Sequence, residues 1–184
     1  MKILTGDLKG RAIFFKPNRH LRPTADKTRK AIFDMLQGQM EGKRVLDLFS
    51  GTGALGFEAL SSGARFVTFV EKEKNQAALI QKNLITLGMS DKARVMIGDF
   101  LMGVEELSRE EESFDFIFID PPYDKGLGEK AMTVFSQSRL ILDGGFIILE
   151  CRKSETLPKV EDSFTCLKNK IYGDSRILVY RCIR

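Results

Sequence analysis

The architecture of this chain can be recognised from the stretch Asp47-Leu48-Phe49-Ser50-Gly51-Thr52-Gly53-Ala54-Leu55-Gly56. This stretch spaces three glycines as GxGxxG, after an apolar run typical of a buried strand and before a run typical of a helix. Glycine lets the backbone turn tightly and approach a ligand closely. A strand, such a loop and a helix together predict one unit of an open α/β sheet that binds an adenosine-like cofactor.

The same alternation of strand and helix continues along the chain. Strands are predicted at 44–49, 66–71, 93–97, 114–119 and 146–151, and helices near 54–62, 75–87, 100–107 and 129–136. Residues 164–172 and 177–182, joined through Gly173-Asp174-Ser175, are predicted to form a terminal antiparallel pair. The pattern therefore predicts a Rossmann-like α/β fold: a mostly parallel seven-stranded sheet with a C-terminal antiparallel strand and helices on both faces.

The residues before this core do not follow the alternation of strand and helix. Residues 1–15 are predicted as two short strands around 6–10, a β-hairpin, and residues 16–23 as a basic loop that its prolines hold extended. Thr24 is expected to cap a helix that runs to about Met40. We expect one domain over 1–184, with an extension at 1–43 and a catalytic core at 44–184.

Composition narrows the classes of protein that this chain can be. No apolar stretch reaches the roughly 20 residues of a membrane span, and the N-terminus lacks the apolar core of a signal peptide. Three widely spaced cysteines and one histidine, His20, favour neither a disulfide framework nor a metal site. We therefore expect a cytoplasmic protein with no metal and no membrane partner.

Charge is distributed unevenly along the sequence. The net charge is +7 over residues 1–44, −7 over 45–151 and +4 over 152–184. Basic ends around an acidic centre fit a catalytic core whose ends meet a polyanion. Lysines scattered for solubility alone are the other interpretation of this pattern.

Acidic residues at the predicted strand ends indicate the cofactor. Glu71 closes the second strand, twenty residues after Gly51, where an acid can bind ribose hydroxyls. Asp47 lies where the amino acid portion of a cofactor would sit, and its charge would oppose a pyrophosphate. Asp99 and Phe100 follow the third strand and suit the amine and the face of adenine. The glycine pattern alone fits NAD equally well, but these acids favour S-adenosylmethionine.

Asp120-Pro121-Pro122-Tyr123 follows the fourth predicted strand, where chemistry collects in open α/β sheets. An aromatic exocyclic amine is a poor nucleophile because its lone pair is delocalised into the ring. The Asp120 carboxylate and the Pro121 carbonyl can accept hydrogen bonds from both N–H groups of such an amine and orient its lone pair. Tyr123 can stack on the base that carries it. The sequence therefore predicts methyl transfer to a nucleobase amine that has left its helix.

Several segments carry a resemblance to a known family: Gly10-Arg11, Leu21-Arg22-Pro23-Thr24, Arg29, Phe33, 45–56, Asp120-Pro121-Pro122-Tyr123 and Tyr172-Gly173-Asp174. In these segments the chain resembles the RsmD family of class I S-adenosylmethionine-dependent methyltransferases. That family methylates N2 of a guanine in bacterial 16S ribosomal RNA, nominally guanine 966. The resemblance implies the same reaction here, on 16S rRNA within the 30S subunit or an assembly intermediate.

The resemblance also implies roles for individual residues. The cofactor would be bound by Thr24, Asp47, Phe49, Ser50, Gly51, Gly53, Glu71, Asp99 and Phe100. Asp120, Pro121 and Tyr123 would be the catalytic residues. The basic N-terminus adds predicted RNA contacts by Arg11, Arg22, Lys27, Arg29 and Lys30.

Three other functions stay open on the sequence alone. The first is methyl transfer to another planar amine, such as adenine N6 in a nucleic acid or a glutamine side chain in a protein. The second is an NAD-dependent oxidoreductase, which the glycine loop permits. The third is an RNA-binding protein that has kept the cofactor fold without catalysis.

Overall fold

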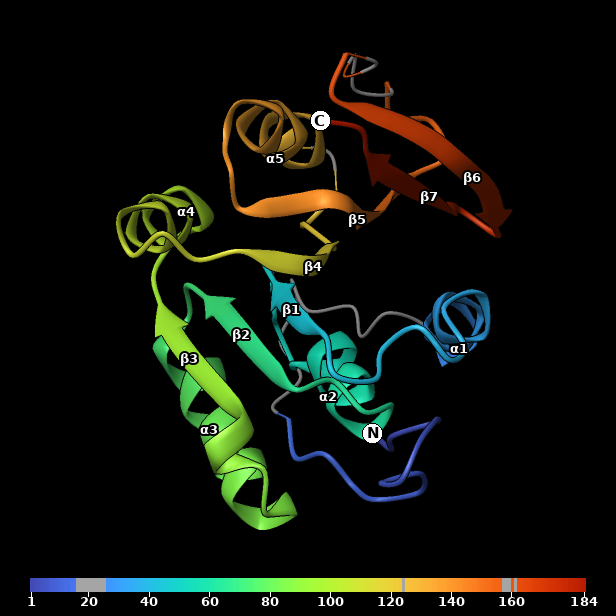
Figure 1. Ribbon diagram of the computed structural model, residues 1–184. Helices are drawn as coiled ribbons and strands as arrows, with labels where there is room; N and C mark the ends of the chain where they lie inside the picture. The colour runs from blue at the N-terminus through green and yellow to red at the C-terminus, as the bar shows by residue number, and fades with distance from the viewer. Residues whose placement is uncertain (16–25, 124, 157–159, 161) are drawn as a thin grey trace.

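The computed structural model describes residues 1–15, 26–123, 125–156, 160 and 162–184, and it forms a single sheet with helices on both faces (Figure 1). The helices are α1 (Asp26–Met35), α2 (Ala54–Ser61), α3 (Lys74–Leu87), the 3₁₀ turn η1 (Ser90–Lys92), α4 (Phe100–Arg109) and α5 (Leu127–Gln137). The strands are β1 (Arg44–Asp47), β2 (Phe66–Glu71), β3 (Ala93–Ile97), β4 (Phe114–Ile119), β5 (Ile141–Arg152), β6 (Phe164–Tyr172) and β7 (Ser175–Cys182).

The seven strands lie in the order β3-β2-β1-β4-β5-β7-β6. Strands β1 to β5 are parallel to one another, whereas β7 runs antiparallel to both β5 and β6. The order reverses direction between β1 and β4, which is the switch point where open α/β sheets bind their ligands. The predicted fold class and the C-terminal antiparallel strand are confirmed.

Alternating strand residues build two hydrophobic cores, one on each face of the sheet. In β1, Leu46 belongs to the cluster that packs with α4 and α5, and Val45 belongs to the cluster that packs with α1, α2 and α3. Figure 1 shows the same division, with α4 and α5 on one side of the strands and the other three helices on the opposite side. Both faces are covered, so the central strands are mostly apolar.

Three predicted boundaries differ from the structure. The N-terminal hairpin is shorter than predicted: residues 1–3 pair antiparallel with 11–13 through the Lys2–Ala12 bridge, and the amides of Ile3 and Ile13 donate to the carbonyls of Arg11 (3.0 Å) and Met1 (2.9 Å), but residues 1–15 contain no regular strand. Helix α1 ends at Met35 rather than near Met40, because the chain turns through Gly38 at a left-handed φ of 74°. Strand β5 begins at Ile141, five residues before the predicted start, since a shift in register against β4 lets the pairing continue.

The N-terminal segment is fastened to the core by a buried ion pair. Arg29 of α1 lies 3.0 Å (Nε–Oε1) from Glu58 of α2, and both side chains are only 1% exposed. Glu58 also accepts hydrogen bonds from the backbone amides of Leu4 (2.8 Å) and Thr5 (3.0 Å). Arg29 donates in addition to the Lys2 carbonyl at 2.9 Å. Arg29 is therefore a structural residue, and the prediction that it contacts RNA is wrong because its guanidinium is fully enclosed.

Two further expectations from the sequence concern membranes and metal ions. None of the helices formed by the described residues is long and apolar enough to cross a membrane. Among the same residues, no group of three or more His, Cys, Asp or Glu is placed to hold a metal ion. Thr24, Arg22 and His20 lie outside the described residues, as does the predicted loop 16–23.

Candidate active site

The carboxyl ends of the parallel strands meet at one edge of the sheet, which we call the carboxyl edge. β1 ends at Asp47 and β2 at Glu71, Asp99 follows β3, and Asp120 follows β4. The register confirms that the ends are level, because Asp47 pairs with Phe69 on one side and Phe118 on the other. Four acidic residues that are far apart in the sequence therefore lie along one edge.

The glycine loop turns sharply between β1 and α2. The Ser50 hydroxyl donates to the Asp47 carbonyl (2.8 Å), and the Gly53 amide donates to the Ser50 carbonyl (2.6 Å). Gly53 has φ 77°, a left-handed conformation that favours glycine, and a Cβ there would lie 2.9 Å from Phe57 Cε2. The loop is thus held close to the strand ends, with Gly51 beside β2.

Glu71 and Asp47 are buried carboxylates on either side of that loop. Glu71 accepts hydrogen bonds from the amides of Gly51 (2.6 Å) and Glu73 (2.7 Å). Burial raises its pKa, against the lowering effect of those two bonds. Asp47 accepts from the Gly56 amide at 3.0 Å, and burial raises the pKa of Asp47 to about 7, with the charge of Glu71 adding to the shift. Two buried acids close together lower the stability of the folded protein. Acids kept at such a cost, with raised pKa values, are candidates for a functional site.

The end of β3 supplies an acid and an aromatic ring, and the ring packs against a second ring from the glycine loop. Asp99 is exposed, and its Oδ1 caps helix α4 by accepting from the amides of Leu101 (2.9 Å) and Met102 (3.1 Å). The rings of Phe49 and Phe100 lie 5.2 Å apart between centroids. Because Phe49 follows β1 and Phe100 begins α4, this contact brings the glycine loop and the Asp99 turn together. The cap leaves further lone pairs on the Asp99 carboxylate for a ligand.

Asp120 to Tyr123 follow β4 as predicted. Asp120 is half-buried, Pro121 is buried and Tyr123 is half-buried. The Tyr123 hydroxyl donates to Glu150 Oε1 at 2.9 Å and lies 2.8 Å from Ser175 Oγ. The Arg152 guanidinium lies 5.4 Å from the centroid of the Tyr123 ring. The motif is therefore joined to the ends of β5 and β7.

Sequence reasoning missed Glu150, Arg152 and Ser175. Glu150 offered a signal, because it is an acid inside an otherwise apolar strand, with Leu149 and Cys151 beside it. The other two offered none, since Arg152 and Ser175 resemble ordinary residues at strand ends. Only the antiparallel pairing of β5 with β7, which sets Arg152 opposite Ser175, brings them together.

Three of the predicted RNA-contacting residues lie at the surface of the described part of the chain. Arg11, Lys27 and Lys30 are exposed, and Lys30 forms an ion pair with Asp34 at 2.6 Å. Arg11 lies in the segment that packs on the carboxyl end of α2, where the Asp7 amide donates to the Ser61 carbonyl (2.8 Å). That end of α2 is opposite the glycine loop. Arg11 therefore lies away from the acids of the carboxyl edge.

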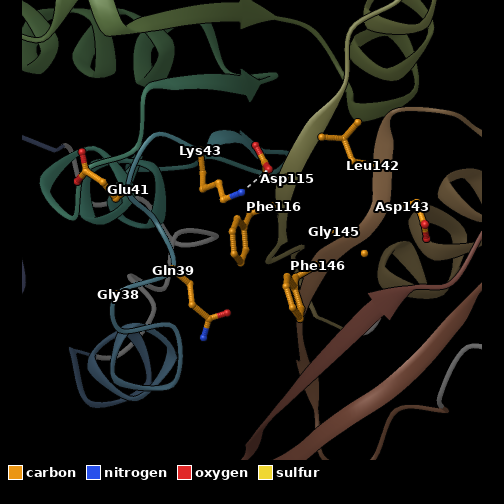
Figure 2. Close-up of a pocket in the computed structure, with 11 residues that line it drawn as sticks. Gly38, Gln39, Glu41, Lys43, Asp115, Phe116, Leu142, Asp143, Gly145 and Phe146 are labelled. Atoms are coloured by element: carbon orange, nitrogen blue, oxygen red, sulfur yellow. Dashed lines mark hydrogen bonds and ion pairs between the residues drawn. The ribbon is translucent and has the colours of Figure 1, made fainter.

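A cavity of about 340 Å³ lies at the other end of the strands. Figure 2 shows its lining, with Lys43 and Asp115 joined by an ion pair of 2.9 Å and with Phe116 and Phe146 side by side. Lys43 precedes β1, and Asp115 lies near the start of β4. The cavity therefore opens at the amino ends of these strands and is not part of the candidate active site.

The strand order, the glycine loop and the acids at the carboxyl edge define the class of protein. The chain has the fold of the class I methyltransferases, the class that uses S-adenosylmethionine. The family described as "Conserved hypothetical protein 95" matches residues 1–181, and the chain belongs to it. This membership confirms the resemblance to the RsmD family.

Relatives and solved structures agree with that family. The chain is 33% identical over 180 residues to "Ribosomal RNA small subunit methyltransferase D" of Buchnera aphidicola, covering 98% of this chain and 92% of the relative. It is also 33% identical to the Haemophilus influenzae protein of the same name, over 181 residues with the same coverage. Among solved structures, the protein yhhF of Escherichia coli superposes with a TM-score of 0.85 at 28% identity, covering 100% of this chain and 98% of that one.

Proposed function

We propose that this chain transfers the methyl group of S-adenosylmethionine to the exocyclic N2 of a guanine in 16S rRNA, nominally guanine 966. The observation that carries the proposal is the placement of Asp120-Pro121-Pro122-Tyr123 on the same sheet edge as the glycine loop and Glu71. Relatives at 33% identity bear the name of a ribosomal RNA small subunit methyltransferase. The guanine and its N2 position are inferred from the RsmD family.

The residues at the carboxyl edge fit S-adenosylmethionine better than a dinucleotide. Glu71 would accept hydrogen bonds from the ribose hydroxyls, and Asp99 would accept from the adenine amine beside Phe100. Asp47, which is buried and acidic, would face the amino acid portion. Three carboxylates around the loop would repel a pyrophosphate, which argues against NAD. Ser50, Gly51 and Gly53 would line the pocket with backbone, and Phe49 would add an apolar wall. We also assign Thr24 to this pocket, on the family resemblance alone.

Asp120 and Pro121 would act mainly by positioning. S-adenosylmethionine supplies an electrophilic methyl group on a sulfonium centre. The Asp120 carboxylate and the Pro121 carbonyl would accept hydrogen bonds from the two N–H groups of the target amine, which directs the nitrogen lone pair at that methyl group. In well-oriented reactions such positioning accounts for up to about 7–11 kcal/mol of the barrier. Tyr123 would stack on the flipped base, worth about 1–3 kcal/mol.

The exposed basic residues would hold the RNA by its phosphates. Lys27 and Lys30 project from α1, and Arg11 from the N-terminal segment. Arg22 belongs to the same proposal on its sequence position alone. Replacing Lys27 and Lys30 with alanine is expected to weaken RNA binding and to make its salt dependence shallower by about 0.7–0.9 for each phosphate that is no longer neutralised. Lys92→Ala, an exposed lysine in η1, is the matched control. An unchanged slope in the double variant would exclude these contacts.

Methylation of 16S rRNA tests the proposal directly. The purified protein would be incubated with labelled S-adenosylmethionine and either naked 16S rRNA or partly assembled 30S particles, and the modified nucleotide would then be mapped. We expect a single N2-methylguanine. Asp120→Ala should lose methyl transfer and keep its affinity for S-adenosylhomocysteine. Full activity in that variant would exclude the proposed mechanism.

A second candidate function is methyl transfer to another amine, because the four-residue motif recognises any planar amino group. Mapping distinguishes the two, since N6-methyladenine in the product would identify adenine as the target. Methylated glutamine in a protein substrate would identify the other alternative. Binding of NAD without S-adenosylhomocysteine would instead support an oxidoreductase.

A further inference from the structure

Tyr123 is held at both ends of its side chain. Two prolines stiffen the backbone that leads to it, and its hydroxyl group lies between Glu150 of β5 and Ser175 of β7. Because each hydroxyl carries one proton, Ser175 donates to the phenolic oxygen when Tyr123 donates to Glu150. The Arg152 guanidinium, 5.4 Å from the ring centroid, covers part of the same ring. A ring restrained in this way has little freedom to rotate or tilt.

The three contacts come from one face of the sheet. Glu150 is opposite Ile177 in the β5–β7 ladder, and Arg152 is opposite Ser175. Residues two apart on a strand share a face, and so do directly opposed residues. Ile177 belongs to the cluster that packs with α1, α2 and α3, so the whole group lies on that face. The sheet itself therefore fixes where the Tyr123 hydroxyl is held.

The arrangement is costly for the folded state. Glu150 is only 3% exposed, and its second oxygen, Oε2, has no hydrogen-bond partner among the described residues. Burial raises the pKa of Glu150, although the hydrogen bond from Tyr123 lowers it in part. A buried carboxylate with one unsatisfied oxygen is destabilising, and an apolar residue would fit a strand end more easily. Such a cost is expected where the group serves the active site.

We propose that Glu150 and Ser175 are positioning residues that fix the plane of the Tyr123 ring, so that the ring is oriented for the base before the substrate arrives. This inference rests on the proposed function and adds to it two residues outside the four-residue motif. Glu150 and Ser175 act through Tyr123 and touch neither the cofactor nor the reacting amine. Arg152 supports the same ring through its cation–π contact.

Steady-state kinetics of single variants test the inference. Tyr123→Phe keeps the ring and removes the hydroxyl, and Glu150→Ala removes the acceptor. Each is expected to lower kcat/KM for RNA by about 10- to 100-fold, the usual range for a lost hydrogen bond to a charged group. Affinity for S-adenosylhomocysteine should stay within about twofold. Glu150→Gln keeps an acceptor oxygen and should recover most of the activity. Tyr180→Phe, which removes a hydroxyl from a buried tyrosine of the opposite core, is the matched control.

A double variant separates positioning from general stability. If Glu150 acts through the Tyr123 hydroxyl, Tyr123→Phe combined with Glu150→Ala is no worse than the more impaired single variant. If the kcat/KM losses of the two single variants multiply in the double variant, Glu150 acts elsewhere and the inference is overturned. Should Glu150→Ala fail to fold, Ser175→Ala replaces it in the same cycle. Wild-type activity in Tyr123→Phe also overturns the inference, while leaving the proposed function intact.

An NMR measurement made without RNA distinguishes a failure of this inference from a failure of the proposed function. The chain has three tyrosines and no tryptophan, so ¹³C labelling of tyrosine Cζ gives three NMR signals, and Tyr123→Phe assigns one of them. Glu150→Ala and Ser175→Ala are each expected to move the Tyr123 signal, and Glu150→Ala should leave the signals of Tyr172 and Tyr180 in place, whereas Ser175 also lies opposite Tyr172. An unmoved Tyr123 signal would overturn the inference even if RNA is methylated. If the wild-type protein methylates no RNA, the proposed function fails, and this signal still decides whether Glu150 and Ser175 hold the ring.

Discussion

Replacing Asp47 with asparagine should make the protein more stable at alkaline pH and weaken its cofactor binding. Asp47 is 1% exposed, and burial raises its pKa from 3.8 to about 7. Between those values the folded state keeps a proton that the unfolded chain has released. The free energy of unfolding of the wild type therefore falls as the pH rises from about 4 to about 7.

The size of the effect follows from the shift. About three pKa units at about 1.4 kcal/mol each correspond to roughly 4 kcal/mol between pH 4 and pH 8. The asparagine carbonyl can still accept from the Gly56 amide, but its NH₂ group needs a new acceptor, which costs about 1–3 kcal/mol. We expect Asp47→Asn to be more stable than the wild type by about 1–3 kcal/mol at pH 8, and no more stable at pH 4.

Urea denaturation followed by circular dichroism at both pH values measures this difference. Asp91→Asn, at an exposed acid in η1, is the matched control and should change stability little at either pH. Binding of S-adenosylhomocysteine should weaken by about tenfold or more in Asp47→Asn, since a hydrogen bond to a charged group is lost. A stability difference that does not change with pH would refute the reasoning about the buried charge.

Three further predictions concern packing and the cofactor. Gly56→Ala places a Cβ 2.1 Å from Phe69 Cε1, so overpacking should lower the free energy of unfolding by about 1–3 kcal/mol or more, and an unchanged urea midpoint would contradict this. Arg29→Met leaves the buried charge of Glu58 without its partner and should cost about 3–5 kcal/mol, part of which the added change Glu58→Gln should restore in the same assay. Glu71→Gln should leave the thermal midpoint within a few degrees of the wild type and weaken S-adenosylhomocysteine binding by about tenfold in calorimetry; equal affinity would remove Glu71 from the cofactor site.

The sequence predicted the sheet well because its signals are local. An apolar run such as 114–119 indicates a strand, and the glycines at 51, 53 and 56 indicate a turn. Each signal is contained within a few residues. The N-terminal hairpin, which equally local signals predict, forms one antiparallel bridge and no regular strands. Its backbone amides at Leu4 and Thr5 bond to Glu58, more than fifty residues away, instead of to a partner strand. Arg29 was misassigned for the same reason, because its charge is visible in the sequence and its burial is not.

The class of fold, the glycine loop and the four acids at the strand ends can be recognised without a structure, because periodicity and turn residues are short-range properties of the chain. Which polar groups meet depends on how distant strands pair. Tyr123, Glu150 and Ser175 are spread over fifty-two residues, and their contacts depend on the order β4-β5-β7 and on the antiparallel register between the last two strands. The physical reason is that pairing between distant strands fixes positions that no local pattern contains.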